Sequence, residues 1–598
     1  MAGPLTAKKA INRGNIIRDA TIRDFSGGWN EIDNDLNLST KYSKVLKNLQ
    51  LQVDGSIGVR FGTKLFADTS VYLDKILNME YYSGHIIAVG SNGKIVRINS
   101  VGEVILIWDD TWAATLPGSP SGWSSGLTVV NFAVFNGFLV VVNGVNKPLM
   151  INTGLTVTYL NDLATGSNLN APITRYVRAH SRYLVFAGDL LAPSVLYITS
   201  IDTIGTFYGD PAPNDGVNVD LSSRVPSGEV EITGLGRYRD QLVVSFNDVL
   251  IPGTLGIYDA SGNHVPTFDD ALEEHGSISH RAIHNLGDDM LFADNVGVPS
   301  ISRALFTGSL RPQRESSLID PAIQRQINKV DTIEGLLRHV FAVYDSIQGN
   351  YMLFIPSHAD AEYSTETKGF IYKKQKELKI AAWSEFIDWN WSCATKSALK
   401  RVFFAKDANV YLYGDRTDPF YADYIGEQET FDDGETFTDQ LGWTPVGDIN
   451  TSGVPIRFEW ELPWTDAGER FLKKASKYVN LDTVGTGRFK LQMFTDNIYK
   501  DKLSPGETFT DGTIFTDGTG WDVDTYIPIL EMEFTGGDSE GYGGDPFGNY
   551  YGSGRPTAFE GLYAWTMQHK ISKFRIIGET MAELRFISIT HAYTLGSA

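Results

Sequence analysis

The residues with the clearest capacity for chemistry are carboxylates gathered in two segments of the chain. Residues 417–456 contain nine Asp and Glu side chains, residues 503–554 contain ten, and neither segment contains Lys or Arg. Together they supply −19 of a net charge of −21. Carboxylates at this density can bind hard cations, or they can face a polyanion that slides past without binding. A third interpretation is a pair of solvated acidic loops.

Each segment contains an arm with the motif GETFTD, at residues 434–439 and 506–511. A calcium loop needs about six to eight oxygen ligands, and the spacing of an EF-hand is missing, whereas Asp-Gly pairs favour hairpin turns. We therefore expect no metal and no cofactor, although cation binding by the arms stays open. At least one of the arms 427–448 and 505–524 is predicted to project as a hairpin toward a channel or its mouth; the alternative places both on an outer wall. The candidate channel-facing residues are Glu427, Glu429, Asp432, Asp433, Glu435, Asp439, Glu507, Asp511, Asp517, Asp522 and Asp524.

Other motifs for catalysis are few. His275, His280 and His284 could offer three imidazoles to zinc, but in a strand His275 would point to the opposite face, so we interpret them as structural. Residues 122–126, GWSSG, match the GxSxG pattern of hydrolases, but they sit in a loop rather than between a strand and a helix. The single cysteine, Cys393, excludes an internal disulfide and a cysteine-built metal site. The sequence therefore predicts no catalytic residues and no enzyme.

The elements that must position these residues are almost all strands. A short β-branched or aromatic run, a turn rich in Asn, Asp or Gly, and a second run recur seven times from His85 to Gly414, with starts 45 to 61 residues apart. Hairpins at a period of about fifty residues predict one four-stranded sheet per repeat, closed radially. The predicted fold class is all-β, with a β-propeller-like repeat domain of six or seven blades and additional C-terminal β-subdomains. The alternative is a set of stacked β-sandwiches.

One good helix is predicted to begin at Asp320-Pro321, because Asp favours the N-cap and Pro the first helical position. Residues 39–49 and 269–274 are weaker helix candidates. No secretory signal is expected, because the first 23 residues lack an apolar run. No membrane-spanning helix is expected, because the most apolar stretch, 127–142, is interrupted by Asn136-Gly137 and is typical of two strands.

The expected domain organisation has five parts. They are a basic N-terminal tail at 1–23, a segment at 24–60 that docks on the propeller, the propeller-like domain at 60–415, a first acidic arm with a β-subdomain at 416–500, and a second acidic arm with a Gly-rich loop and a β-subdomain at 501–598.

The start of the chain carries a distinctive series of turn residues. It contains Asp24-Phe25-Ser26-Gly27-Gly28-Trp29-Asn30, then Asn48-Leu49, then Gly55-Ser56-Ile57-Gly58-Val59-Arg60-Phe61-Gly62. This series resembles the start of the tail nozzle (tail tubular, packaged-DNA-stabilising) proteins of short-tailed bacteriophages, which often open with a Gly-Gly-Asn-like turn, an Asn-Leu pair and a Gly-Ser-x-x-x-Arg-x-Gly hairpin. The resemblance extends to HRAIHNLGDDMLFADNVGVPSISRA from His280, to SLIDPAIQRQIN after it, and to the VYDSIQGNYMLFIP hairpin with Ala382-Trp383-Ser384 downstream. The family-like structural residues are Gly27, Gly28, Asn48, Gly55, Arg60 and Gly62. The GETFTD arms have no counterpart in the family pattern.

The resemblance implies a structural virion protein of a phage tail, assembled in the host cytoplasm. Six copies would form a ring below the head–tail adaptor (connector), extend the DNA channel, retain packaged DNA and let it pass at ejection. The implied partners are further copies of the chain, the adaptor ring, tail fibre or tip proteins, and viral double-stranded DNA that passes without sequence-specific binding. An acidic lining suits this role, because a basic lining would bind the phosphates. The alternative function is a soluble β-propeller module that binds a carbohydrate or receptor, as a tail or adhesin component, because propellers host unrelated functions.

Overall fold

The structure is a computed structural model of the 598-residue chain. It describes residues 17–52, 54–109, 123, 129–160, 171–208, 216–225, 231–260, 264–286, 289–301, 314–331, 336–356, 367–375, 380–387, 389–415, 419–423, 454–467, 474–485, 487–495, 530–535, 557–558, 571–580 and 583–595.

By its internal contacts the chain divides into two compact units. Unit 1 comprises Met1–Arg60, Lys376–Ser384 and Val454–Ala598, and unit 2 comprises Phe61–Gln375 and Glu385–Gly453. The strand β30 (Ile380–Phe386) runs across one of these boundaries.

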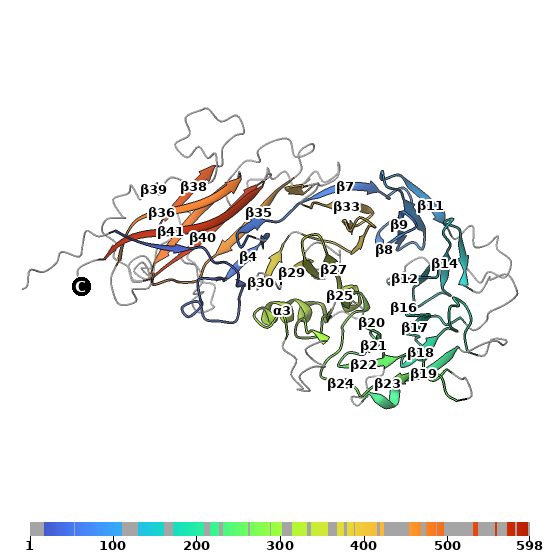
Figure 1. Ribbon diagram of the computed structural model, residues 1–598. Helices are drawn as coiled ribbons and strands as arrows, with labels where there is room; N and C mark the ends of the chain where they lie inside the picture. Colours follow the sequence, from blue (N-terminus) through green and yellow to red (C-terminus); the bar gives the residue numbers. More distant parts are fainter. Residues whose placement is uncertain are drawn as a thin grey trace, which may run out of the picture. The chain divides into compact units, whose positions relative to one another are not determined.

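Unit 2 is a β-propeller (Figure 1). Over the described residues, seven antiparallel groups of strands follow one another along the chain. The first three groups are β8 (Ile76–Tyr82), β9 (His85–Gly90), β10 (Ile95–Ile98) and β11 (Val104–Trp108); β12 (Asn131–Phe135), β13 (Phe138–Val142), β14 (Leu149–Ile151) and β15 (Val157–Tyr159); and β16 (Tyr176–His180), β17 (Tyr183–Ala187), β18 (Val195–Ile198) and β19 (Val217–Asp220). The fourth and fifth are β20 (Gly234–Tyr238), β21 (Gln241–Ser245), β22 (Val249–Thr254), β23 (Thr267–Phe268) and β24 (Leu272–Glu273); and β25 (His284–Leu286) and β26 (Asp289–Leu291). The last two are β27 (Phe341–Asp345), β28 (Asn350–Ile355) and β29 (Lys368–Gln375); and β31 (Cys393–Lys396), β32 (Val402–Lys406) and β33 (Asn409–Tyr413) with β7 (Thr63–Asp68).

The ring of unit 2 is closed by strands from opposite ends of the unit. The early strand β7 pairs antiparallel with the late strand β33, from Thr63 opposite Tyr413 to Asp68 opposite Asn409. The first strands also form an unbroken circle of contacts, in the order β8, β12, β16, β20, β25, β27, β31 and back to β8. Closure of this kind removes exposed sheet edges. The predicted propeller is therefore confirmed, with seven blades among the described residues, and the stacked-sandwich alternative is wrong for this unit.

Turn residues that accept positive φ allow tight hairpins in the ring, as the β12–β13 turn illustrates. Asn136 and Gly137 have φ values of +46° and +77°, and they join β12 to β13 where Phe135 lies opposite Phe138. Two consecutive residues with positive φ match the type I′ turn that fits the twist of a tight hairpin. The division of residues 127–142 into two strands is thus confirmed.

The central strands of a blade are buried on both faces, as β13 illustrates. In β13, Leu139 and Val141 pack in one apolar cluster with strands of the preceding sheet, while Val140 and Val142 pack in another with β16 and β17. All four side chains are fully buried. Because a blade is sandwiched between two neighbours, its central strands are continuous apolar runs rather than alternating ones.

The helix predicted at Asp320-Pro321 is confirmed as α3 (Asp320–Asp331). The two weaker helix predictions are wrong: residues 39–49 contain β3 (Tyr42–Ser43), β4 (Val45–Lys47) and the start of β5 (Leu49–Leu51), and residues 269–274 contain β24. Pairing with partners distant in the sequence, such as β35 (Val454–Glu461) for β4, overrides the local helix preference. Three short 3₁₀ helices complete the described helical elements: η3 (Ser222–Arg224), η4 (His280–Ala282) and η5 (Leu336–His339). None of the helices in the described ranges has the length and apolar character that crossing a bilayer requires.

Unit 1 is a sandwich of two sheets. In one, the long strand β41 pairs with β36 on one edge and with β1 and β6 on the other; in the second, β40 lies between β35 and β37. Phe586 from β41 joins the two sheets, because its ring centroid lies 5.8 Å from that of Phe458, 5.4 Å from that of Trp460 and 5.5 Å from that of Phe489. The strands are β1 (Ile17–Ile22), β2 (Gly28–Trp29), β6 (Ile57–Val59), β35 (Val454–Glu461), β36 (Lys474–Gly485), β37 (Arg488–Thr495), β38 (Leu530–Thr535), β39 (Thr557–Ala558), β40 (Ser572–Thr580) and β41 (Leu584–Leu595), while β34 (Ala422–Asp423) lies in unit 2.

The strand pairing of unit 1 differs from the expected series of separate parts. β35 and β37, from the expected first C-terminal subdomain, both pair with β40 from the second, so the two share their sheets. Residues 17–22 of the expected basic tail form β1 on β41, and residues 24–60 belong to unit 1. The two expected C-terminal subdomains thus interleave, because each sheet needs strands from both to bury its apolar face.

Candidate functional site

All eleven predicted channel-facing carboxylates, from Glu427 to Asp524, lie outside the described residues. Within the GWSSG motif only Trp123 is described. It is fully buried in an apolar cluster, and its Nε1–H donates a 3.3 Å hydrogen bond to the carbonyl of Lys147. Trp123 therefore serves the propeller core.

The family-like motif is described, and a buried pair lies at its centre. Asn48 has φ +53°, and its side-chain amide donates to the carbonyl of Arg457 at 2.7 Å. The Oδ1 of Asn48 accepts a 3.0 Å hydrogen bond from Nε of Arg60, whose side chain is 1% exposed. The amide N–H of Arg60 also donates to the carbonyl of Asn48 at 3.1 Å. These bonds tie the two ends of the β5–β6 hairpin to β35 within unit 1.

Two glycines of the motif meet backbone that leaves no room for a side chain. Gly28 has φ +65°, and a Cβ there would lie 2.7 Å from that of Ala382. A Cβ on Gly62, in unit 2, would lie 2.0 Å from the carbonyl oxygen of Ala422. The motif is thus a framework of tight turns and buried hydrogen bonds.

Replacing Asn48 with alanine is expected to lower the free energy of unfolding by about 3 kcal/mol, because it removes two buried hydrogen bonds and because alanine accepts the left-handed region less readily than asparagine. Asn48→Gly is the matched control: it loses the same hydrogen bonds but tolerates the positive φ, so it should lose about 1 kcal/mol less. Urea unfolding of both variants measures the difference. Equal losses would show that the backbone conformation contributes nothing, and parental stability of N48A would contradict the framework role.

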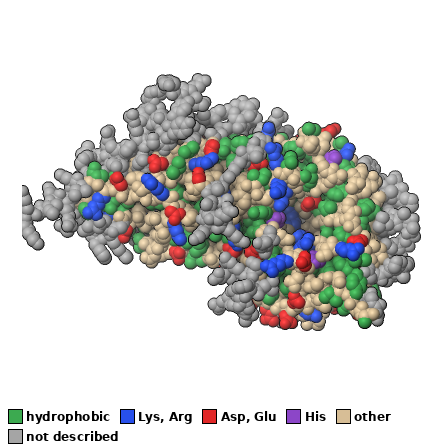
Figure 2. Space-filling view, in the orientation of Figure 1, with side chains coloured by type: hydrophobic (Ala, Val, Ile, Leu, Met, Phe, Trp, Pro, Cys, Tyr) green, Lys and Arg blue, Asp and Glu red, His purple; other side chains and the backbone are tan. Residues whose placement is uncertain are grey.

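Polar side chains from five different blades gather at the centre of the propeller ring. Glu80 lies on β8, Arg178 on β16, His284 on β25, Tyr344 on β27 and Lys396 on β31, and each is half-buried. The His284 and Tyr344 rings are 6.3 Å apart, and Nζ of Lys396 lies 5.9 Å from the Tyr344 ring. In Figure 2, Lys, Arg and His side chains surround a hollow in this part of the molecule. These are the first strands that form the closed circle of contacts, so the cluster lies around the propeller axis.

The environment of the cluster shifts its proton equilibria. Burial raises the pKa of Glu80 to about 7, against the attraction of Arg178 and Lys396. Burial lowers the pKa of His284 to about 3, assisted by repulsion from Lys396 and Arg178. At neutral pH the centre therefore holds the positively charged Arg178 and Lys396. The imidazole of His284 is neutral there, and the carboxyl of Glu80 is partly protonated.

The three histidines considered for zinc do not form a site. The structure has the 3₁₀ helix η4 at His280, so the expected continuous strand is absent, and only His284 enters a strand. Nδ1 of His280 accepts a 3.0 Å hydrogen bond from the amide of Leu235, and burial lowers the pKa of His280 to about 3. Across the residues that the structure describes, no group of His, Cys, Asp and Glu could hold a metal ion.

Sequence reasoning missed the axial cluster. Of its members only His284 was named from the sequence. They belong to different repeats, and the charged ones are single residues within the first run of a hairpin, as Glu80 is in ILNMEYY and Arg178 in YVRAH. A charged residue in a run that is otherwise buried was the available signal, because such a position needs either a partner or water.

No protein-family model matches the chain, and no curated protein matches it. Among solved structures, "Streptogramin B lyase structure" matches at 10% identity and a TM-score of 0.35, over 59% of this chain and 98% of that chain. "YCF48 bound to D1 peptide" matches at 11% identity and a TM-score of 0.34, over 59% and 96%. "Crystal structure of WD40 beta propeller domain of Doa1" matches at 8% identity and a TM-score of 0.33, over 60% and 99%. The propeller assignment of unit 2 rests on its own strand pairing and ring closure.

Proposed function

We propose that the chain is a structural subunit of a bacteriophage tail. Six copies form a nozzle ring below the head–tail adaptor, and the ring extends the DNA channel, retains packaged DNA and lets it pass at ejection. The observation that carries the proposal is the motif around Asn48 and Arg60. Asn48 and Arg60, two of the residues that resemble the nozzle family, are used by this chain as buried framework in unit 1.

In this proposal the DNA passes through the lumen that the six copies enclose, and not along the axis of any one propeller. First strands of neighbouring blades contact one another all round the propeller axis. We do not expect a DNA duplex, whose major groove alone is about 12 Å wide, to pass through such a closed circle. The channel is therefore the lumen of the six-membered ring.

Assembly should depend on a template. The chain carries a net charge of −21, which opposes self-association of identical copies. We expect the purified chain to be monomeric at low salt and to form a six-membered ring when the adaptor ring is added, with assembly favoured by salt because salt screens like charges. Analytical ultracentrifugation with and without the adaptor measures this. No association with the adaptor at any salt concentration would overturn the nozzle proposal.

Neutralising the arms tests the acidic lining. Asp432, Asp433, Asp439, Asp511 and Asp517 are changed together to Asn, which preserves turn chemistry and removes five charges per copy. Tails with this variant should assemble normally but eject DNA more slowly or less completely, most clearly at low salt.

The control for the arms removes five exposed carboxylates of unit 2 instead, and should eject DNA like the parent. Its residues are Asp74, Asp240, Asp248, Asp270 and Asp407. If the arm variant ejects DNA like the parent at every salt concentration, the arms lie outside the channel.

The axial cluster favours a second candidate, a propeller module that binds its ligand without forming a ring. Such a module would remain a monomer or trimer in the presence of the adaptor and would bind a carbohydrate or receptor by itself. Glycan binding by the purified chain, together with failure to join the adaptor, would favour it over the nozzle.

A further inference from the structure

The outer strand of the first blade has an unpaired edge. β11 pairs with β10 on one side and ends its four-stranded sheet on the other. At the turn between these strands, the amide N–H of Asn99 donates to the carbonyl of Glu103 at 3.1 Å. Because residues of an antiparallel ladder alternate in direction, Ile105 then bonds toward β10, whereas Val104 and Leu106 direct their N–H and C=O groups outward. Within the part of the chain that the structure describes, these outward groups have no hydrogen-bond partner.

The side chains along this edge are apolar. The strand reads VILIW, with four half-buried residues followed by the buried Trp108. Val104 and Leu106 pack in part against the core of the blade, and Val101 in the preceding turn is 81% exposed. Free edges of this kind pair readily with another extended chain, so proteins commonly place charged residues or proline on them. β11 carries neither.

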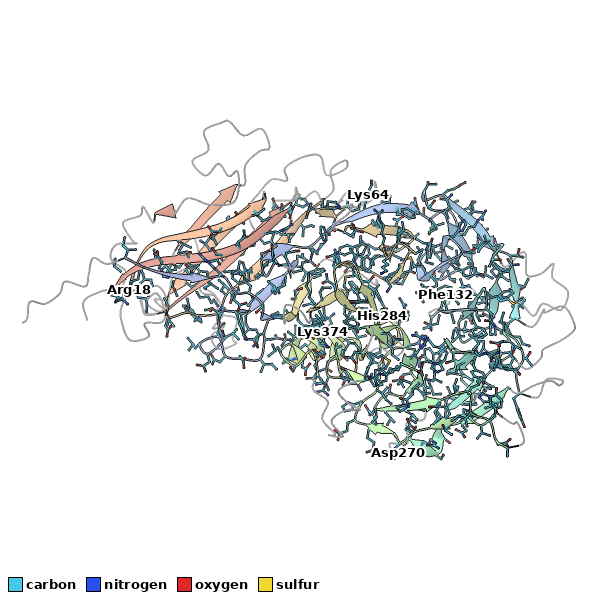
Figure 3. All side chains as sticks on the ribbon, viewed as in Figure 1. Arg18, Lys64, Phe132, Asp270, His284 and Lys374 are labelled. Carbon is cyan, nitrogen blue, oxygen red and sulfur yellow. The ribbon has the colours of Figure 1, made fainter. Side chains whose placement is uncertain are left out.

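The outer strands of other blades are protected. β19 exposes Asn218 and Asp220, and β15 has only three residues. β7 pairs with β34 at Thr63 and exposes Lys64 and Asp68. Figure 3 shows Lys64 at the outer side of the ring. Among the outer strands in the described ranges, β11 is therefore the longest that has no charged side chain.

An arginine without a bonded partner lies beside this edge. Arg97 on β10 is half-buried and lies directly opposite Ile105. Its Nε is buried, and in the described ranges its guanidinium forms no hydrogen bond or ion pair. The nearby carboxylate of Glu103 instead accepts a 2.8 Å hydrogen bond from the side-chain amide of Asn99. A strand added beyond β11 would lie roughly 10 Å from β10, a separation that Arg97 and a glutamate of the added strand can span together.

We propose that β11 binds an extended, largely apolar segment of a partner protein, which joins the blade as a fifth strand and places a carboxylate against Arg97. Hydrogen bonds to the main chain of Val104 and Leu106 supply affinity, and the carboxylate supplies selectivity. A second copy of the chain is disfavoured as the occupant, because each copy carries a net charge of −21 and brings another Arg97. The edge lies wholly within unit 2, so the proposal does not depend on ring formation.

Fluorescence anisotropy of the full-length chain with the labelled peptide acetyl-TVTVEVTVT-amide tests the proposal, at about 150 mM salt to screen the charge of the protein. The control peptide has the same side chains but carries N-methyl groups on its four central amides, which removes donors on both of its edges. We expect it to bind at least about tenfold more weakly, because the main-chain hydrogen bonds are lost. Hydrogen exchange should slow at Val104 and Leu106 when the first peptide binds, and should stay unchanged in β19.

Two variants separate the contributions of the edge and the arginine. Leu106→Pro removes an outward N–H, which an edge strand tolerates, and should weaken binding at least about tenfold. Circular dichroism checks its fold, and Val104→Pro replaces it if it does not fold. Arg97→Gln should bind the glutamate peptide severalfold more weakly than the parent does. It should bind the glutamine counterpart, TVTVQVTVT, like the parent.

Several results would overturn the proposal. They are no binding at millimolar peptide, equal binding of the methylated peptide, and slowed exchange at another strand in place of β11. Equal binding of the glutamate and glutamine peptides by the parent would remove the role of Arg97 and with it the acidic partner. Dimers of the parent that are lost in Leu106→Pro, measured by sedimentation, would assign the edge to a second copy and overturn the partner assignment.

Discussion

Replacing Trp389 with alanine is expected to lower the free energy of unfolding of unit 2 by about 3–5 kcal/mol. The side chain is 1% exposed, and its ring lies 4.9–6.1 Å from five other aromatic rings of the unit. Those rings belong to Phe354, Phe386, Trp391, Phe404 and Tyr413. Phe404 and Tyr413 lie on the sheet that β7 completes, so the cavity would weaken the sheet that closes the ring.

Two control variants define the origin of this loss. Trp389→Phe keeps an aromatic ring and should lose less than half as much stability as the alanine variant. Leu399→Ala, at a side chain that is 79% exposed, should change the stability by less than about 0.5 kcal/mol. Denaturant unfolding measured by tryptophan fluorescence and by circular dichroism gives both values. A loss below about 1 kcal/mol for Trp389→Ala would show that the aromatic cluster does not secure the closing sheet.

Acidification from about pH 7 to 5 is expected to cost the propeller about 4 kcal/mol of stability. Burial lowers the pKa of His280 and His284 to about 3 and that of His339 to about 4. A histidine with a lowered folded pKa takes up its proton on unfolding, so stability is lost as pH falls below the unfolded value of about 6.5, by about 2 kcal/mol per histidine over this range. Glu80 acts in the opposite direction: its pKa is raised to about 7, so protonation favours the folded state and offsets about 2 kcal/mol.

Unfolding free energies at the two pH values test this balance in three variants. His284→Gln should reduce the loss by about 2 kcal/mol, and Glu80→Gln should enlarge it by a similar amount. His85→Gln, at the β8–β9 turn, is the control and should leave the loss unchanged. An identical pH dependence in the parent and in both test variants would contradict the assignment of these groups as the source.

The sequence predicted those features of the fold that depend on neighbouring residues. Asn136-Gly137 specified a tight hairpin because both positions accept positive φ, and Asp320-Pro321 specified a helix start. The recurrence of such hairpins about every fifty residues predicted a radial repeat, since a sheet with two apolar faces needs a neighbour on each side. The residues of the family-like motif were also found from the sequence, although not the hydrogen bonds between Asn48 and Arg60.

Tertiary structure decided how distant segments combine. Nothing in β7 indicates that it completes the sheet of β33, more than 340 residues later, because strand pairing uses backbone groups that are the same in every residue. For the same reason β35 and β37 of the expected first C-terminal subdomain take β40 of the second as a shared partner. The axial cluster is the clearest case. Glu80, Arg178 and Lys396 are isolated charges along the chain, and only closure of the ring brings them around one enclosed centre, where the low dielectric makes their charges matter to one another.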